Sequence, residues 1–205
     1  MLGLPKATEL SRPLPKKAVF EMFKPSTVDR KLFDEQINRM AIVAEISPQT
    51  LAVAANEKVA SVYVVHVALK VPECDKKNIA LLSKLIDQRM LFVLQYGDVA
   101  RLAAYRAGKV LVSGSKPIDD WVLPLTGIDL EAIWENAIAQ IAGIDLTSGK
   151  GLDAKIVENE RRDKLVKKIQ ALEKKAMSER QPRRKWELAE EIRKQKAELE
   201  EAVNG

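Results

Sequence analysis

The sequence predicts an α+β fold, with a mixed, mostly antiparallel sheet, packed helices, and a C-terminal helical arm or helical hairpin. Two apolar runs, at residues 62–69 and 90–94, are typical of strands buried on both faces in the middle of a sheet. Helix-forming residues between them favour a right-handed crossover and parallel strands. After Gly151, Lys, Arg, Glu, Ala and Leu dominate, which predicts helix. We therefore predict a globular domain over residues 1–148 and a coiled-coil-like arm over residues 152–205.

The first part of the chain is expected to be an extended lead-in over residues 1–14, followed by a short helix from Pro15 to Phe23. Ser26 is placed to cap a second helix. The apolar face of that helix is predicted from helical spacing and comprises Val28, Leu32, Phe33, Ile37 and Met40. Residues 41–46 then predict a strand, and residues 51–55 are a candidate for another.

Capping residues and turns place the elements that follow. Asp75 is expected to cap the crossover helix. Glycine-containing turns at residues 97–98 and 107–108 predict antiparallel hairpins of the runs at 99–106 and 109–113. Asp129 should cap a helix that ends at Gly143, with Ile128 stapled onto Ile133. The core-facing stripe of this helix consists of Leu130, Ile133, Trp134, Ala137, Ile138 and Ile141.

The predicted arm has two apolar stripes with coiled-coil spacing, separated by the helix breaker Pro182. The first stripe is Leu165, Ile169, Leu172 and Ala176, and the second is Ala189, Ile192, Lys196, Leu199 and Val203, with Lys196 a polar interruption. Such thin stripes must pack on each other, on the domain, or on another chain. The residues predicted to dock a partner are Leu165, Ile169, Leu172, Ile192 and Leu199.

Positive charge gathers at the break between the two predicted helices. The chain of 205 residues has a net charge of +5. Six cations in this short region face a single acid, Glu179, and they are Lys174, Lys175, Arg180, Arg183, Arg184 and Lys185. They could bind a phosphate backbone or an acidic partner, or remain a solvated helical turn.

Several classes of function are disfavoured by what the sequence lacks. The lone Cys74 cannot form an intramolecular disulfide, and no apolar run is long enough to span a bilayer, so we expect a cytoplasmic protein without a membrane partner. His66, inside the apolar run, is expected to be a structural imidazole. One histidine and one cysteine cannot assemble a common zinc site. Two glycine motifs that bind phosphate, Gly-x-x-x-x-Gly-Lys-Ser/Thr and Gly-x-Gly-x-x-Gly, are both absent from the sequence.

A metal-dependent nuclease is the enzyme class that the sequence leaves open. Such a site needs carboxylates and a lysine at neighbouring strand ends. Lys70 ends an apolar run, but Ala68 stands where a carboxylate is needed, and Glu45 and Asp98 lie elsewhere in the sequence. We expect no catalytic residue, no metal and no cofactor, and the sequence favours a protein that is not an enzyme.

Several segments of the chain resemble one bacterial family. They are the opening residues 1–9, residues 14–17, the turn at 45–48, the run at 78–86, and residues 132–136. Together they are similar to an uncharacterised family, the domain of unknown function 4391. The resemblance carries over no catalytic residue. It implies an accessory role near DNA, with helicase or methyltransferase neighbours in restriction-like or phage-defence systems.

Two functions are therefore weighed, and the sequence favours the first. The first is a non-catalytic accessory or adaptor protein whose C-terminal helices dock a partner protein or a second copy of the chain. The alternative is a DNA-binding or metal-dependent nuclease component that uses the basic turn at residues 174–185. The first requires the apolar stripes, and the second requires the cations and would lose affinity steeply with salt.

Overall fold

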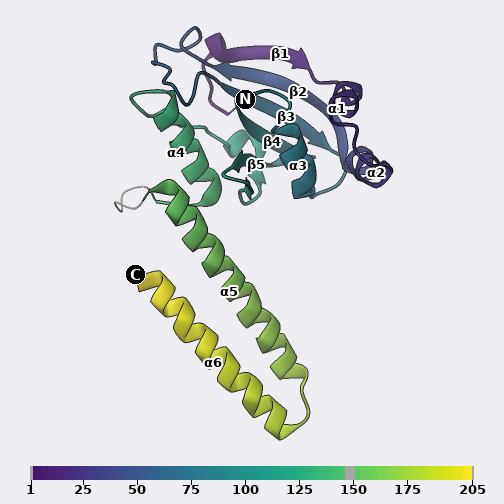
Figure 1. Ribbon diagram of the computed structural model, residues 1–205, viewed down its shortest axis with the longest axis vertical. Coiled ribbons are helices and arrows are strands. Elements are labelled where there is room, and N and C mark those ends of the chain that lie inside the picture. Colours follow the sequence, from purple (N-terminus) through teal and green to yellow (C-terminus); the bar gives the residue numbers. More distant parts are fainter. Residues whose placement is uncertain (1, 146–150, 205) are drawn as a thin grey trace. The chain divides into compact units, whose positions relative to one another are not determined.

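The structure is a computed structural model that describes residues 2–145 and 151–204. The chain divides into two compact units, Met1–Asp145 and Leu146–Gly205, which are shown in Figure 1 and described separately below. The residues 147–150 of the predicted linker lie outside the described residues. Among the described residues, no helix combines the length and the apolar character needed to cross a membrane.

The first unit is built on a mixed sheet with the strand order β1-β2-β3-β4-β5-β6, and β7 pairs with β5. Its strands are β1 (Glu9–Pro13), β2 (Ile37–Ile46), β3 (Val62–Leu69), β4 (Arg89–Tyr96), β5 (Val99–Arg106), β6 (Lys109–Val112) and β7 (Lys116–Pro117). The β3–β4 pair is parallel, and the other pairs of described strands are antiparallel. This confirms the predicted α+β class and its mixed, mostly antiparallel sheet.

The parallel pair is joined through α3 (Lys76–Leu82), as the sequence predicts. Asp75 caps this helix, because its carboxylate accepts a hydrogen bond of 2.8 Å from the backbone N–H of Lys77. One core of the sheet includes residues of α3 and of the first two helices, α1 (Lys16–Phe23) and α2 (Thr27–Gln36). It is formed by Val19, Phe33, Ile37, Met40, Ile42, Val65, Val67, Ile79, Leu82, Met90, Phe92, Leu94 and Ala103.

The second helix is shorter than predicted. Ser26 caps it, accepting 3.1 Å from the N–H of Asp29, but it ends at Gln36. Ile37 and Met40, which we placed on its apolar face, are buried residues of β2 instead. The register of β2 against β3 shifts between Ile37 and Arg39. An extra residue in a strand turns the usual spacing of two into a spacing of three, and this spacing imitates a helix.

Two further expectations for the N-terminal region are corrected. Residues 9–13 of the expected lead-in form strand β1, which pairs antiparallel with β2 and is exposed along its whole length. Residues 51–55 do not form a strand, and the backbone there makes one isolated bridge, between Ala54 and Asp129. A fully exposed edge strand lacks the alternation of apolar and polar residues by which strands are recognised.

Helix α4 (Leu130–Ala142) follows a long connection. Asp129 caps it, with its carboxylate 2.8 Å from the N–H of Ala132, and Gly143 ends it at a φ of +63°. The whole predicted stripe of this helix is buried. The predicted staple is wrong, because the side chain of Ile128 is 93% exposed and cannot pack on Ile133.

The second unit consists of two helices, α5 (Leu152–Ser178) and α6 (Pro182–Asn204). They run antiparallel as a hairpin, which confirms the predicted break at Pro182 (Figure 1). The connection is short. The carboxylate of Glu179 accepts hydrogen bonds from the N–H groups of Arg180 at 2.8 Å and Gln181 at 2.9 Å.

Candidate binding site on the C-terminal hairpin

The apolar stripes of the hairpin are closed against each other. Leu165 and Ile169 of α5 are 8% and 6% exposed, and Leu188 of α6 is 9% exposed. The other residues predicted to dock a partner, which are Leu172, Ile192 and Leu199, are half-buried. The structure therefore brings all five predicted docking residues into one intramolecular seam, which we call the hairpin seam.

The α6 side of the seam differs from the prediction at two positions, each shifted by one residue. Its inward positions are Leu188, Ile192, Gln195 and Leu199, which are spaced by four, three and four. Ala189 and Lys196, which were assigned to the stripe, are exposed. Val203 lies outside the residues whose side chains are described. The shift favours packing of the two helices, because the larger apolar side chain of Leu188 takes the seam position predicted for Ala189.

Ion pairs join the two helices on either side of the seam. Lys196 Nζ lies 2.8 Å from Glu173 Oε1, and Arg161 donates to Glu198 at 2.9 Å. A longer pair connects Lys168 to Glu191 at 3.8 Å. Exposed pairs of this kind each stabilise a protein by about 0.2–1 kcal/mol, so they select this pairing of helices more than they hold it together.

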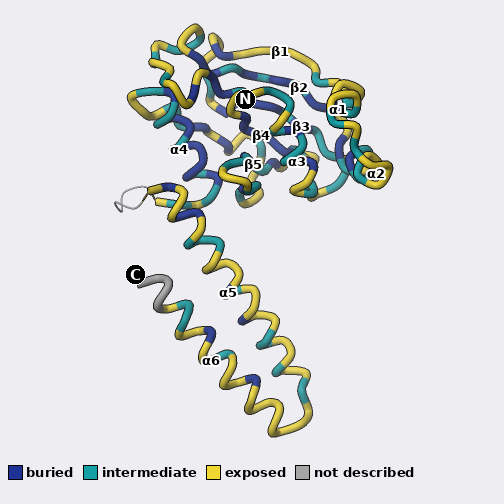
Figure 2. The backbone as a smooth tube through the Cα atoms, in the orientation of Figure 1, coloured by how far each residue is buried: buried dark blue, intermediate teal, exposed yellow. Residues whose placement is uncertain are grey.

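The predicted basic residues gather at the turn of the hairpin, which we call the tip. The structure exposes all six of them, on both helix ends and the connection, and Figure 2 shows this region as almost wholly exposed. Arg183 pairs with Glu187 of the next helical turn at 3.3 Å. Within the described part of the chain, the other five cations form no ion pair: Lys174, Lys175, Arg180, Arg184 and Lys185.

The acidic residue of the tip, Glu179, accepts hydrogen bonds from the backbone. Hydrogen bonds from the N–H groups of Gln181 and Arg180 lower the pKa of Glu179, and the nearby charges of Arg184 and Lys175 act in the same direction. Glu179 therefore stays ionised and shapes the turn. Its carboxylate oxygen Oε1 accepts from two N–H groups, which is how the short connection is held.

The tip also carries large apolar side chains in the open. Trp186 is 67% exposed and Met177 is 86% exposed. The other two tryptophans of the chain, Trp121 and Trp134, are each 3% exposed. Sequence reasoning did not single out Trp186, because nothing in the spacing of α6 says whether a tryptophan near its start packs inward.

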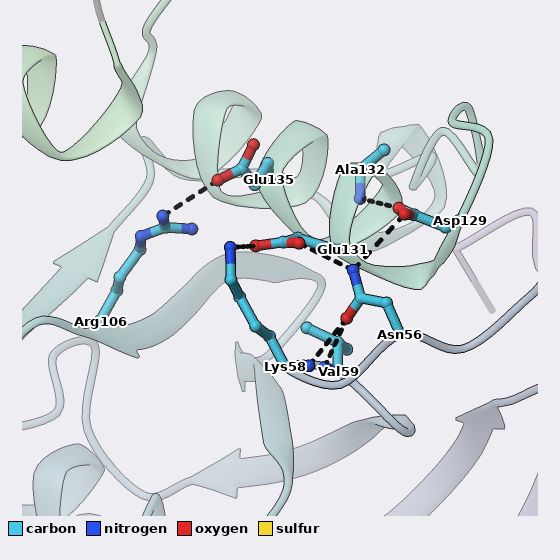
Figure 3. Close-up of polar contacts among 8 residues, drawn as sticks. All are labelled: Asn56, Lys58, Val59, Arg106, Asp129, Glu131, Ala132 and Glu135. Carbon is cyan, nitrogen blue, oxygen red and sulfur yellow. Dashed lines mark hydrogen bonds and ion pairs between the residues drawn. The ribbon is translucent and has the colours of Figure 1, made fainter.

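The sheet unit contains a separate polar cluster, drawn in Figure 3, at the start of α4. Glu131 accepts from Asn56 at 2.7 Å and from Lys58 at 2.9 Å. The carbonyl oxygen of the Asn56 side chain accepts from the N–H groups of Lys58 and Val59. The hydrogen bond between Lys58 and Glu131 lowers the pKa of Glu131 and raises the pKa of Lys58.

Every carboxylate of this cluster already has a structural partner. Asp129 caps α4, Glu131 is bound as described, and Glu135 accepts from Arg106 at 3.1 Å (Figure 3). A general base must accept a proton from substrate, and an ionised carboxylate with a lowered pKa that is paired to a lysine does so poorly. The cluster ties the loop at Asn56 to a helix more than seventy residues later in the chain.

The histidine and the cysteine of the chain have structural environments. His66 Nε2 lies 2.6 Å from Gln95 Oε1. Because the amide nitrogen of Gln95 donates to the carbonyl of Gly97, its oxygen is the acceptor and His66 the donor. Burial raises the pKa of the Cys74 thiol to about 12, so its reactive thiolate is scarce at neutral pH.

Two of the residues weighed for a nuclease, Glu45 and Lys70, lie near opposite ends of one strand, β3. Glu45 lies beside Tyr63, at the start of β3, whereas Lys70 follows the other end of that strand. Seven residues of strand separate these ends by about 23 Å. Among the described residues, no group of three or more His, Cys, Asp or Glu side chains could hold a metal ion.

A small cavity lies beside the N-terminal segment of the sheet unit. Its volume is about 120 Å³, and it is lined by Leu2, Leu4, Glu9, Leu10, Val43, Ala44 and Val64. Pockets for small ligands usually enclose about 300–1,000 Å³. The cavity is therefore too small for a substrate of ordinary size.

The fold and the hairpin together define an α+β sheet protein that carries a basic, antiparallel helical hairpin. The chain belongs to the family described as a domain of unknown function, DUF4391, whose sequence model matches residues 2–199. The match covers both units, so the hairpin is part of the family's sequence pattern. Comparison with curated proteins and with solved structures gives no match.

Proposed function

We propose that this protein is a non-catalytic accessory protein whose C-terminal hairpin binds nucleic acid through the phosphate backbone. The observation that carries the proposal is the tip, where six exposed cations accompany one acid. Five of these cations have no ion-pair partner among the described residues. Lysine and arginine gathered in this way release counterions when they meet phosphates, which is the main source of sequence-independent affinity.

The stability of the hairpin does not account for the three tip cations at the start of α6. Arg183, Arg184 and Lys185 occupy the first turn of α6, which contains no acidic residue. Positive charges at the start of a helix oppose its dipole, at a cost of about 0.3–1 kcal/mol each. Lys174 and Lys175, at the end of α5, are placed favourably and stabilise their helix. An external anion bound at the start of α6 would therefore offset the unfavourable charges of Arg183, Arg184 and Lys185.

Closure of the hairpin seam argues against the first function weighed from the sequence. The apolar stripes demand burial, and each helix of the hairpin already supplies it to the other. Docking of a protein through the seam would require the hairpin to open or to exchange α6 with a second copy. The tip is exposed without any such change, and this favours nucleic acid as the partner.

The family resemblance supports the proposed setting. An accessory role beside a helicase or a DNA methyltransferase, in a restriction-like or phage-defence system, would bring the tip close to DNA. We therefore propose a cytoplasmic protein that works next to such enzymes and does not itself cut DNA. The structural partners of Asp129, Glu131 and Glu135 in the polar cluster at α4 are consistent with the non-catalytic part of this proposal.

A charge-matched pair of variants tests the proposal. One variant removes three tip cations, R183A/R184A/K185A, and the other removes three exposed cations from the middle of α5, R162A/K164A/K167A. Both lower the net charge equally. Titration of a labelled DNA duplex at about 0.1 M salt should show a loss on the order of a hundredfold for the tip variant, by counterion release from three phosphates.

The middle variant should bind nearly as tightly as the natural chain. Equal losses in both variants would mean that net charge alone attracts DNA and that the tip is not the site. Natural affinity in the tip variant would contradict the proposal directly. Circular dichroism of both variants would verify that the hairpin is still helical.

A further inference from the structure

We infer that the tip binds unpaired nucleic acid, and that the indole of Trp186 is the surface on which a base stacks. This inference rests on the proposed function, and it names the form of nucleic acid that the tip selects. Its starting point is the contrast among the three tryptophans. Trp121 is buried and donates its indole N–H to the carbonyl of Ala100 at 2.9 Å, and Trp134 is buried in the stripe of α4. Trp186 is 67% exposed.

The position of Trp186 on α6 keeps its ring away from the hairpin seam. The seam follows Leu188, Ile192 and Gln195, whereas Trp186 lies about 160° around the helix from Leu188, at 100° per residue. It is therefore on the outer face of α6. Packing against α5 cannot explain a tryptophan there, and its indole N–H has no hydrogen-bond partner among the described residues.

The neighbours of Trp186 leave its ring open and bring a cation beside it. Residues three and four apart share a helix face, so Trp186 is flanked by Pro182, Arg183, Ala189 and Glu190. The exposed alanine is too small to cover an indole. Arg183 is a tip cation on the same face, and its side chain is 92% exposed.

An open aromatic ring next to cations has different consequences for paired and unpaired strands. Phosphates are present in both, so the cations attract both. In a duplex the bases are stacked on one another and their faces are covered. In a single strand a base is free to stack on an aromatic side chain, which contributes about 1–3 kcal/mol per base and depends little on sequence. Trp186 should therefore add affinity for single strands without adding affinity for duplex.

The same surface fits a lipid membrane poorly. A helix that lies on a membrane presents a continuous apolar face to the acyl chains. Around Trp186, the outer face of α6 continues with Glu190, Arg193 and Ala197, at helical spacing. Trp186 stands there among charged and small residues, and Met177, the other large exposed apolar side chain of the tip, lies on α5. The two side chains provide little area to bury, so anionic lipid would be held by charge alone.

The experiment uses the full chain and three variants, W186A, W186F and R183A/R184A/K185A. Labelled oligothymidylate and a duplex of the same strand length are titrated with each protein, and anisotropy gives the affinities. W186A should lose roughly 5- to 150-fold in affinity for the single strand, which is the stacking contribution converted to a ratio. W186F should retain most of that affinity, and neither Trp186 variant should change the affinity for duplex.

Intrinsic fluorescence provides a second readout on the natural chain. Because Trp121 and Trp134 are buried, quenching of tryptophan emission by the single strand would report Trp186, and W186A should abolish it. Anionic vesicles added instead of DNA should leave the emission unshifted. A Trp-dependent shift with vesicles, without quenching by the single strand, would overturn the inference.

The outcomes separate this inference from the proposed function. If the basic variant loses binding while W186A binds both forms like the natural chain, the tip binds phosphate but Trp186 does not stack, and the inference is wrong. If the natural chain binds neither form, both are wrong. If W186A weakens duplex and single strand equally, Trp186 serves the structure of the tip, and the inference is again wrong. Selective loss of single-strand affinity supports it.

Discussion

Lys196 Nζ lies 2.8 Å from Glu173 Oε1, so that α6 is joined to α5 beside the hairpin seam. This contact explains the polar residue that interrupts the predicted stripe of α6. Lys196 does not occupy a seam position, because the inward residue there is its neighbour Gln195, which is 8% exposed. The lysine flanks the seam and pairs across it. The hairpin is thus closed on itself, and what it offers to a partner is its basic tip.

The register of α6 can be tested with two neighbouring positions. Leu188→Asp should reduce the helical content and the melting temperature of the hairpin, because a carboxylate would replace a buried side chain without a partner. Ala189→Asp is the matched control, and it should leave both nearly unchanged because Ala189 is exposed. Circular dichroism melts of both variants would measure this. A larger effect at Ala189 than at Leu188 would restore the register predicted from the sequence.

The ion pair between Lys58 and Glu131 should make stability depend on pH in a defined direction. The pKa of Glu131 is lowered in the folded chain, so its contribution is present above the ordinary glutamate pKa of about 4.3 and is lost as pH falls through the lowered value. Glu131→Gln should therefore be less stable than the natural chain at neutral pH. The difference should vanish in acid.

Glu57→Gln is the control for this prediction, because Glu57 is an exposed acid of the same loop. Denaturant melts at several pH values would compare the two variants. A stability difference for Glu131→Gln that persists unchanged in strong acid would show that the ionised pair is not its source.

The thiol of Cys74 should react slowly with alkylating reagents. Burial raises its pKa to about 12, so almost no thiolate forms at neutral or mildly alkaline pH while the chain is folded. Labelling with iodoacetamide, followed by mass spectrometry, should remain far slower than that of free cysteine up to mildly alkaline pH. It should accelerate when denaturant is added. Rapid labelling of the folded chain at neutral pH would be inconsistent with the buried thiol.

The sheet unit is expected to fold without the hairpin. The core residues that surround α1, α2 and α3 all come from the first 103 residues of the chain, and α4 adds its own buried stripe. Deletion of residues 152–205 should leave a fragment that melts in one cooperative transition. Calorimetry of the fragment and of the full chain would measure this, and a fragment without a transition would show that the units fold together.

An element of this fold can be predicted from the sequence when its pattern of apolar residues indicates clearly which residues are buried. Strands β3 and β4 were predicted because their apolar residues lie on both faces, which few other structures explain. The start of β2 was mistaken for helix because a register shift at Ile37 spaces its apolar residues by three. Strand β1 was missed because all five of its residues are exposed.

Some residues of the candidate site could likewise be predicted from the sequence, and others could not. The basic cluster of the tip can be recognised from the sequence, because the charge of a side chain does not depend on how it packs. The exposure of Trp186 cannot be predicted from the sequence, since a tryptophan at that position could equally have packed into the seam. The cluster of Asn56 and Glu131 was also missed, because it joins a polar loop to a helix distant in sequence, and polar residues of a loop carry no periodicity.

The most direct test of the central claim is the salt dependence of DNA-duplex affinity in the two charge-matched triple variants. For each protein, the slope of log affinity against log salt counts the phosphates neutralised, at about 0.9 per contact for duplex. Removal of Arg183, Arg184 and Lys185 should make the slope shallower by about 2.7, and removal of Arg162, Lys164 and Lys167 should leave it as it is in the natural chain. Identical slopes in the natural chain and the tip variant would contradict the account, because the tip would then hold no phosphate.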